Sequence, residues 1–270
     1  MTGSETPPIL RDKHYEMPSM FTPESLLREA RRQKGLDKVA VPKLCLLDPD
    51  GDLVRQLRAD GRASRHDGWV CYHTDLWLFD LDGREMGVVG CAVGASFAVL
   101  VAEELFGSGC ELLISITSSG QITPSDTPPY FILIDRALRD EGTSYHYLPP
   151  SDWSEASDHL LLALDGAFRD GPRVLQGATW TTDAPFRETE AAITAARARG
   201  ILAVEMEAAG LYAFARARLR DVICLAHVTN QMGTIEGDFE KGEANGTADA
   251  LAVVARIAAK FGYALNQISE

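Results

Sequence analysis

The order of apolar and polar residues along the chain predicts strands that alternate with helices. Short apolar runs bounded by Gly, Pro, Asp or Ser predict buried strands at residues 41–47, 69–81, 86–92, 110–116, 130–135, 174–178 and 222–228. Apolar residues spaced three or four apart predict helices at residues 25–34, 53–58, 97–106, 158–167, 189–199, 208–218 and 247–261. Because no repeat or internal linker interrupts this alternation, we expect one α/β domain.

The most informative stretch, residues 200–212, reads Gly-Ile-Leu-Ala-Val-Glu-Met-Glu-Ala-Ala-Gly-Leu-Tyr. One predicted helix ends before it and another begins after Glu207, so Glu205 and Glu207 lie in a tight passage from strand to helix. Their apolar neighbours predict that both carboxylates are buried, which is costly unless each has partners. Capping of the second helix explains the presence of one of these acids, but it does not explain well why there are two. The alternative is that Glu207 binds the hydroxyls of a polyol, with Met206 packed against the ligand's apolar face.

Polar residues also follow the apolar runs at four other places. They are Asp48 with the acidic turn 48–52, the run Thr117, Ser118 and Ser119, then Asp183, and then Asn230. In open α/β sheets, ligands bind outside the carboxyl ends of the strands. A capped loop explains each group alone, but the four groups and the paired acids together indicate one pocket.

Composition narrows the kind of partner. The net charge of −13 argues against nucleic acid and anionic membranes, which need clustered Lys and Arg, and favours a small molecule. Residues 1–10 show no signal peptide, and the longest apolar run, 88–102, is broken by glycines and falls short of the roughly 20 residues of a membrane helix. The five cysteines lack Cys-x-x-Cys spacing, so we expect reduced core thiols in a cytoplasmic protein, with no metal and no cofactor.

Residues 200–212 resemble the signature of the nucleoside phosphorylase superfamily, which includes hexameric purine nucleoside phosphorylases, uridine phosphorylases and methylthioadenosine/adenosylhomocysteine nucleosidases. Other segments agree in the family's order: Val93-Gly94-Ala95, Ser118-Ser119-Gly120, 140–149, 182–186 and Val228-Thr229-Asn230. The resemblance covers about residues 40–260. It implies a three-layer α/β fold, a central mixed β-sheet flanked by helices, for residues 24–270, preceded by an N-terminal arm at residues 1–23.

The same resemblance implies cleavage of an N-glycosidic bond through a cation-like sugar. Glu207 and Asn230 would be the catalytic residues. The sugar would be bound by Met206, Glu207 and His146. The base would be bound by Phe186, Glu205, Asn230 and Gln231. Asn230 stands where many members have an acid, and an amide donates a hydrogen bond but transfers no proton.

The acceptor site departs from the phosphorylases. Their Gly-Asp-Pro-x-Arg reads Leu47-Asp48-Pro49-Asp50-Gly51 here, and Ser115 stands where they have a second arginine. Loss of two cations slightly favours water over phosphate as the acceptor, oriented by the polar residues Ser115, Thr117, Ser118 and Ser119. Two alternatives stay open: phosphorolysis with Arg55, Arg62 or Arg65 at a relocated phosphate site, and a nucleoside-binding protein without turnover.

The N-terminal arm at residues 1–23 indicates that the protein forms an oligomer. The arm lacks a core of its own, and related pockets are completed by a neighbouring subunit, so we expect a homo-oligomer, a dimer or a hexamer. His14 lies in the arm, where related enzymes place a residue that touches the neighbour's 5′-hydroxyl. For His73 we expect a structural role, because Cys71 and His73 form at most half of a metal site.

Overall fold

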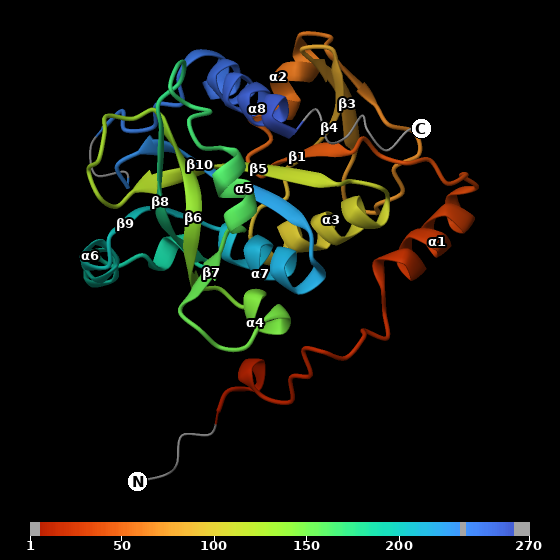
Figure 1. The fold of residues 1–270 in the computed structure, drawn as a ribbon, viewed down its shortest axis with the longest axis horizontal. Coiled ribbons are helices and arrows are strands. Elements are labelled where there is room, and N and C mark those ends of the chain that lie inside the picture. Colours follow the sequence, from red (N-terminus) through yellow and green to blue (C-terminus); the bar gives the residue numbers. More distant parts are fainter. Residues whose placement is uncertain (1–5, 233–235, 262–270) are drawn as a thin grey trace.

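One mixed β-sheet runs through the molecule, with helices on both of its faces (Figure 1). The computed structural model describes residues 6–232 and 236–261. The strands are β1 (Leu44–Asp48), β2 (Ala63–Arg65), β3 (Leu76–Leu81), β4 (Arg84–Gly90), β5 (Leu112–Gln121), β6 (Tyr130–Asp140), β7 (Trp153–Glu155), β8 (Val174–Thr182), β9 (Ile201–Glu205) and β10 (Asp221–Asn230). The helices are α1 (Pro23–Lys34), α2 (Asp52–Ala59), α3 (Ala95–Gly107), α4 (Ser144–Tyr147), α5 (Asp158–Ala163), α6 (Glu190–Ala198), α7 (Ala208–Arg218) and α8 (Thr247–Phe261), with short 3-10 turns η1 (Pro8–Leu10), η2 (Pro185–Arg187) and η3 (Glu243–Gly246). This is the mixed sheet between helices that the sequence predicts.

Part of the sheet closes on itself. The strand order is β10-β6-β8-β9-β5-β1-β4-β3-β2, and β10 also pairs with β5, so β5, β10, β6, β8 and β9 form a ring. The strands β4, β1, β5 and β10 are parallel neighbours, which brings their carboxyl ends to one edge. Only the pairs Gly120–Val204 and Gln121–Ala203 join β5 to the antiparallel β9. The end of β9 therefore crosses the end of β5, and this crossing brings the paired acids to the polar part of β5.

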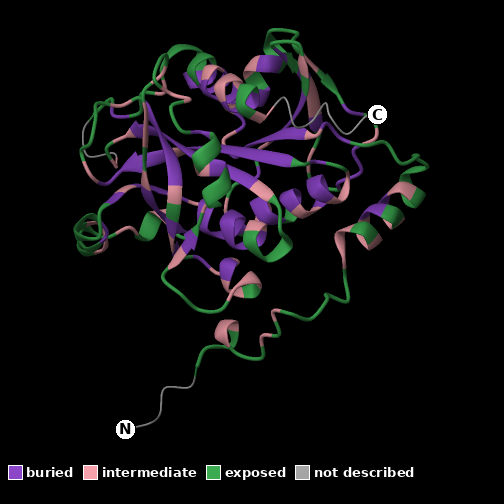
Figure 2. Ribbon diagram, viewed as in Figure 1, coloured by how far each residue is buried: buried purple, intermediate pink, exposed green. Residues whose placement is uncertain are grey.

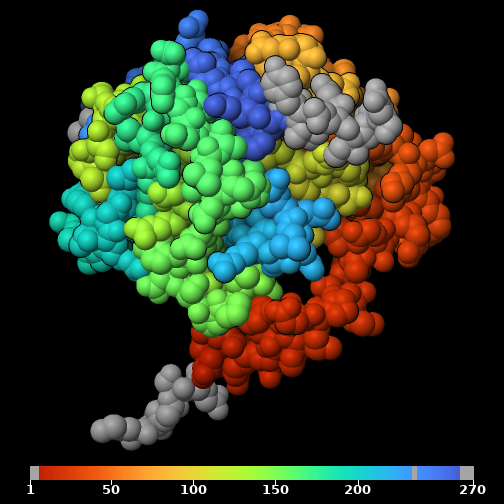
Figure 3. All heavy atoms as spheres, in the orientation of Figure 1, coloured from red at the N-terminus to blue at the C-terminus, as the bar shows by residue number. Residues whose placement is uncertain are grey.

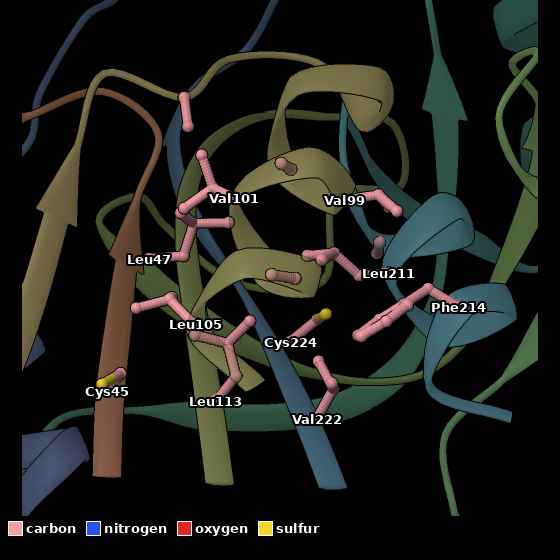
Figure 4. Packing of buried hydrophobic residues seen from close by; sticks show 14 of the residues in the cluster. Cys45, Leu47, Val99, Val101, Leu105, Leu113, Leu211, Phe214, Val222 and Cys224 are labelled. Atoms are coloured by element: carbon pink, nitrogen blue, oxygen red, sulfur yellow. The ribbon is translucent and has the colours of Figure 1, made fainter. Parts of the chain in front are cut away.

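Two apolar cores lie on opposite faces of the sheet. In one of them α3 and α7 pack on the strands through Val99, Leu105, Leu211 and Phe214 (Figure 4). In the other, α2 and α8 cover the opposite face. The sheet is buried almost throughout, whereas the arm is largely exposed (Figure 2). Each fully buried Leu or Phe contributes about 1.5–3 kcal/mol, so these cores fix the strand ends on which the site depends.

A glycine lets α3 and α7 approach closely. A Cβ at Gly210 would lie 2.8 Å from the Cβ of Ala95, a distance that real Cβ atoms do not reach. Ala95 begins α3 directly after Gly94, whose φ of 87° favours glycine. This approach places the N-terminus of α3 beside the residue that precedes α7, Glu207.

The predicted helices 208–218 and 247–261 coincide with α7 and α8. Other boundaries differ. The strand predicted at 110–116 continues to Gln121, so Thr117, Ser118 and Ser119 lie inside β5, paired with β10, and not in a loop after it. Thr117 and Ser119 are buried because β5 pairs with β10 at these positions. A run of polar residues in the sequence does not indicate such a pairing.

The strand predicted at 130–135 continues to Asp140, and the segment expected to be irregular, 136–150, contains its end and α4. Of the predicted strand 69–81 only β3 forms, and the helix expected at 158–167 ends at Ala163. The two short edge strands β2 and β7 were not predicted. Four cysteines are buried as expected, but Cys91 is exposed at the end of β4.

The arm, in its described part, runs along the outside of the molecule before α1 (Figure 3). It contacts its own chain there, because Lys13 donates to His146 at 3.0 Å and the Tyr15 hydroxyl donates to the Tyr145 carbonyl at 3.3 Å. The first five residues of the arm, positions 233–235 of the loop after β10 and positions 262–270 lie outside the described residues. Within the described ranges, no helix combines the length and the apolar character needed to cross a bilayer.

Candidate active site

Glu205 and Glu207 have different partners although they stand two positions apart. Glu205 ends β9 and is 3% exposed. One of its oxygens accepts from the backbone N–H groups of Glu207 and Ala208, both at 2.7 Å, and the other accepts from the hydroxyls of Thr179 and Thr181. Glu205 therefore caps the first turn of α7 and ties it to β8. A contact of Glu205 with a base stays a prediction, and these four hydrogen bonds argue against it because both oxygens are already used.

Glu207 makes no cap hydrogen bond to α7. Its Oε1 accepts from the Gly94 N–H at 2.7 Å, where the positive end of the α3 dipole favours negative charge. Burial at 1% exposure, followed by the nearby charge of Glu205, raises the pKa of Glu207 to about 8. The Thr117 hydroxyl and the Gly94 N–H act in the opposite direction. Capping thus explains one carboxylate and leaves Glu207 available for another role.

A small cavity of about 20 Å³ lies beside the end of β1, residues 116–118 of β5 and His227 of β10. Its polar lining is Asp48, Asp50, Asp52, Thr117, Ser118, His227, Asn245 and Thr247. The Asp50 carboxylate accepts from the backbone N–H of Ser118 at 2.7 Å. Asp48 instead accepts from the N–H groups of Gly51 and Val54, and burial raises its pKa to about 7. The acidic turn therefore folds its own carboxylates into this end of the sheet.

Two cations reach the rim of this turn. Arg55 donates to the Asp50 carbonyl at 2.8 Å and to the Asp52 carboxylate at 2.7 Å, and Lys241 donates to Asp52 at 2.5 Å. The other two arginines considered for an anion site are elsewhere: Arg62 is exposed after α2, and Arg65 pairs with Asp75 on the surface.

Two buried polar groups on the cavity wall have no hydrogen-bond partner among the described residues. They are Nε2 of His227, which is 6% exposed, and Oγ1 of Thr247, which is 4% exposed. The His227 ring stacks on Phe131 with centroids 4.4 Å apart, and burial lowers its pKa to about 4. An unpaired donor or acceptor in a polar cavity of this size is typical of a site for one ordered water.

The other two predicted acceptor residues, Ser115 and Ser119, are buried in β5 on either side of the residues that line the small cavity. Ser115 is 2% exposed and its register partners are Leu47 and Cys224, so it stands inside the sheet and does not line the small cavity. Ser119 is 3% exposed, and its carbonyl accepts from Asn230 at 3.4 Å. The structure thus brings Thr117 and Ser118 to the cavity but not Ser115 or Ser119.

A larger cavity of about 690 Å³ lies at the carboxyl end of β5. Its lining includes the predicted base residues Phe186 and Gln231, together with Gln121, Ile122, Glu188 and Met232. Asn230 stands beside it, where its Oδ1 accepts from the Met232 N–H at 2.9 Å. A Cβ at Gly120 would lie 2.3 Å from the Met232 sulfur and 3.2 Å from Asn230 Oδ1, which explains the glycine in the Ser-Ser-Gly run.

His146, predicted on the sugar side, lies in α4, and its hydrogen bond runs to Lys13 of the arm. No hydrogen bond among the described residues joins it to Glu207 or Met206, so its sugar contact stays a prediction. His14 is exposed in the arm. His73 is exposed and packs edge-on against Phe97 with centroids 6.3 Å apart, so its structural role stays a prediction.

Strand β5 arranges these parts in a line. Residues 116–118 border the small cavity, and residues 121–122 border the large one. At about 3.3 Å per residue, Thr117 and Gln121 are roughly 13 Å apart along the strand. Glu207 stands beside Thr117. The small cavity, the Glu207 carboxyl group and the large cavity therefore lie along one strand.

Sequence reasoning did not identify several of these residues. The bond from Ser118 to Asp50 joins positions 68 apart, and His227 and Thr247 stand in segments whose apolar pattern predicts only core. Glu188 sits in a polar segment without periodicity. A polar residue inside an otherwise apolar run, such as His227, is the one signal that could have found them. Within the described ranges, no three His, Cys, Asp or Glu side chains are arranged to hold a metal ion.

Comparison with known proteins gives concordant matches. A family model described as the phosphorylase superfamily matches residues 36–262. The DeoD-type purine nucleoside phosphorylase of Shewanella denitrificans is 26% identical over 157 residues, which make up 57% of this chain and 66% of the relative. The guanosine phosphorylase of Halorubrum lacusprofundi is 26% identical over 169 residues, 61% of this chain and 66% of the relative. The matched region thus spans just under two thirds of these relatives' own length.

Among solved structures, a uridine phosphorylase from Vibrio fischeri superposes with a TM-score of 0.69 at 18% identity. The superposition covers 82% of this chain and 92% of that chain. At this identity the likeness shows a shared fold.

Proposed function

The chain belongs to the phosphorylase superfamily, and we propose that it cleaves the N-glycosidic bond of a nucleoside or nucleoside-like compound with water, rather than phosphate, as the acceptor. The observation that supports water is the hydrogen bond from the Ser118 N–H to the Asp50 carboxylate, 2.7 Å long. Backbone N–H groups are common ligands of phosphate. Here the chain's own carboxylate takes that N–H, and a phosphate dianion would meet its negative charge.

The size of the small cavity supports the same choice. A water needs roughly 10–15 Å³ of such space, and about 20 Å³ is present. Phosphate, with five heavy atoms, does not fit without movement of the acidic turn. His227 Nε2 and Thr247 Oγ1 offer a water two otherwise unmade hydrogen bonds.

The proposed reaction uses the three parts of the site in order. Ribose lies at Glu207 and Met206, and the base lies toward the large cavity. As the bond from C1′ to the base nitrogen breaks, the Glu207 carboxylate stabilises the positive charge on the sugar. The water oxygen then bonds to C1′, and the Asp50 carboxylate accepts the proton that the water loses.

One observation favours phosphorolysis as the second candidate. Arg55 and Lys241 both reach Asp52, so two cations already lie at the turn. An outward movement of the acidic turn would release them for phosphate. A nucleoside-binding protein without turnover is the third candidate, and the segment Glu205-Met206-Glu207, whose resemblance is to enzymes that act beside the sugar, weighs against it.

The test is base release from a panel of purine and pyrimidine nucleosides, with and without phosphate. We expect release in phosphate-free buffer with free ribose as the sugar product. A requirement for phosphate that saturates, with accumulation of ribose 1-phosphate, would contradict the choice of water. Binding without cleavage of any nucleoside would support the third candidate.

We also propose a homo-oligomer. Met17, Met20 and Phe21 of the arm are 67%, 100% and 71% exposed, which is unfavourable for large apolar side chains unless another copy covers them. Light scattering at working concentration tests this, and an active monomer would contradict it.

A further inference from the structure

Glu188 is a carboxyl group in the large cavity that the proposed reaction has not yet used. It follows η2 and faces the same space as Gln231 and Met232, the residues directly after Asn230. Its side chain is half-buried, and within the described part of the chain it has no hydrogen bond or ion pair. A carboxyl group that loses water and gains no partner is costly, so its position beside the base end calls for a chemical explanation.

The reaction needs an acid at this end. A purine that leaves a sugar carries away the electron pair of the broken bond, and it leaves far more readily when a ring nitrogen is protonated. Asn230 has no transferable proton. Its amide is moreover engaged with Ser119, Thr229 and Met232.

The other charged groups at this cavity are less suited to the task. Arg197 donates to the Ile122 carbonyl at 2.7 and 2.9 Å, and Glu190 is exposed in the first turn of α6. Burial raises the pKa of Glu188 to about 7. An acid with a pKa near the working pH holds a proton and releases it readily.

We propose that Glu188 is the general acid that protonates the departing base of purine nucleosides. The inference rests on the proposed cleavage of the N-glycosidic bond. The proton passes from the carboxyl of Glu188 to a ring nitrogen while the bonding pair of C1′ and nitrogen moves onto the base. The Glu188 carboxylate that remains is reprotonated from solvent, which the open cavity admits.

The experiment compares guanosine with 7-methylguanosine, whose base is already positively charged and leaves without protonation. We expect Glu188→Gln to lower kcat for guanosine by about 100-fold, and kcat for 7-methylguanosine by less than about threefold. Glu85→Gln, at an exposed glutamate of β4 outside both cavities, is the matched control and should leave both rates unchanged. Glu188→Asp, which keeps an acid, should retain more guanosine activity than Glu188→Gln.

The pH profile gives a second readout. In the unmodified protein, kcat for guanosine should fall as pH rises through about 7, and the Gln variant should lose this limb. An equal loss of kcat for both substrates in the Gln variant, or no loss for either, would overturn the role of Glu188. Base release by the unmodified protein would in that case still support the proposed function. If the protein cleaves pyrimidine nucleosides but no purine nucleoside, the proposal that Glu188 protonates a departing purine is wrong. Absence of base release from every nucleoside, with and without phosphate, would overturn both.

Discussion

The two cavities along β5, which we call the acceptor end and the base end of the site, differ in how far the protein has already satisfied its own polar groups. At the acceptor end a cavity of about 20 Å³ is lined by carboxylates held by backbone N–H groups, Arg55 and Lys241. At the base end a cavity of about 690 Å³ contains the unpaired Glu188 and a Phe186 that is 98% exposed. A small, charged cavity suits one small reactant, and a larger cavity suits a flat base that enters and leaves. Substrate identity should therefore depend on the base end, and the kind of reaction on the acceptor end.

The largest effect is expected from Glu207, which serves both ends. Glu207→Gln keeps the side-chain volume and an oxygen for the Gly94 N–H but removes the charge beside the sugar cation. Turnover should fall by at least about 100-fold with every nucleoside and at any phosphate concentration. Steady-state kinetics measure this. Unchanged turnover would remove Glu207 from the site and with it the link between the two ends.

A smaller effect, confined to the acceptor end, is expected from Asp50→Asn. The amide oxygen still accepts from Ser118, but it takes no proton from water and repels phosphate less. Hydrolysis should slow by about tenfold, equally for all bases, and phosphate should begin to stimulate base release. Asp75→Asn, which removes a surface carboxylate paired with Arg65, is the control. A loss that depends on the base would contradict the division between the ends.

At the base end, Phe186→Ala should raise KM by roughly fivefold and leave kcat nearly unchanged, since stacking of one aromatic ring contributes about 0.5–1.5 kcal/mol. The exposed ring has little to lose from the fold, so stability should not change. Leu162→Ala, at another exposed apolar position, is a control for surface effects. A kcat effect larger than the KM effect would place Phe186 in the chemical step.

The parts of the molecule that the sequence predicts are those with local signals, and the parts that it does not predict depend on distant contacts. The passage from β9 to α7 was predicted closely, because Gly200, the helix periodicity and the apolar flanks are all local signals. The extent of β5 is not predicted from the sequence. Thr117 and Ser118 are polar, and they pair with β10 inside a ring of strands that are distant in the sequence. Contacts such as that of Asp50 with Ser118, or the position of Glu188, depend on how loops fold back, which residue spacing does not encode.

The smallest expected effect concerns stability. The pKa of Glu207 is raised from 4.5 to about 8, so between these values the folded state binds more protons than the unfolded state. Stability from this group is therefore present at low pH and falls as pH rises through about 8. Glu207→Gln removes that loss, and its melting temperature at pH 8 should exceed that of the unmodified protein by at least about 2 °C. The gap should close near pH 5. A variant that melts lower at pH 8 would show that the Gly94 N–H and the Thr117 hydroxyl outweigh burial, and that the carboxylate is already charged before a sugar binds.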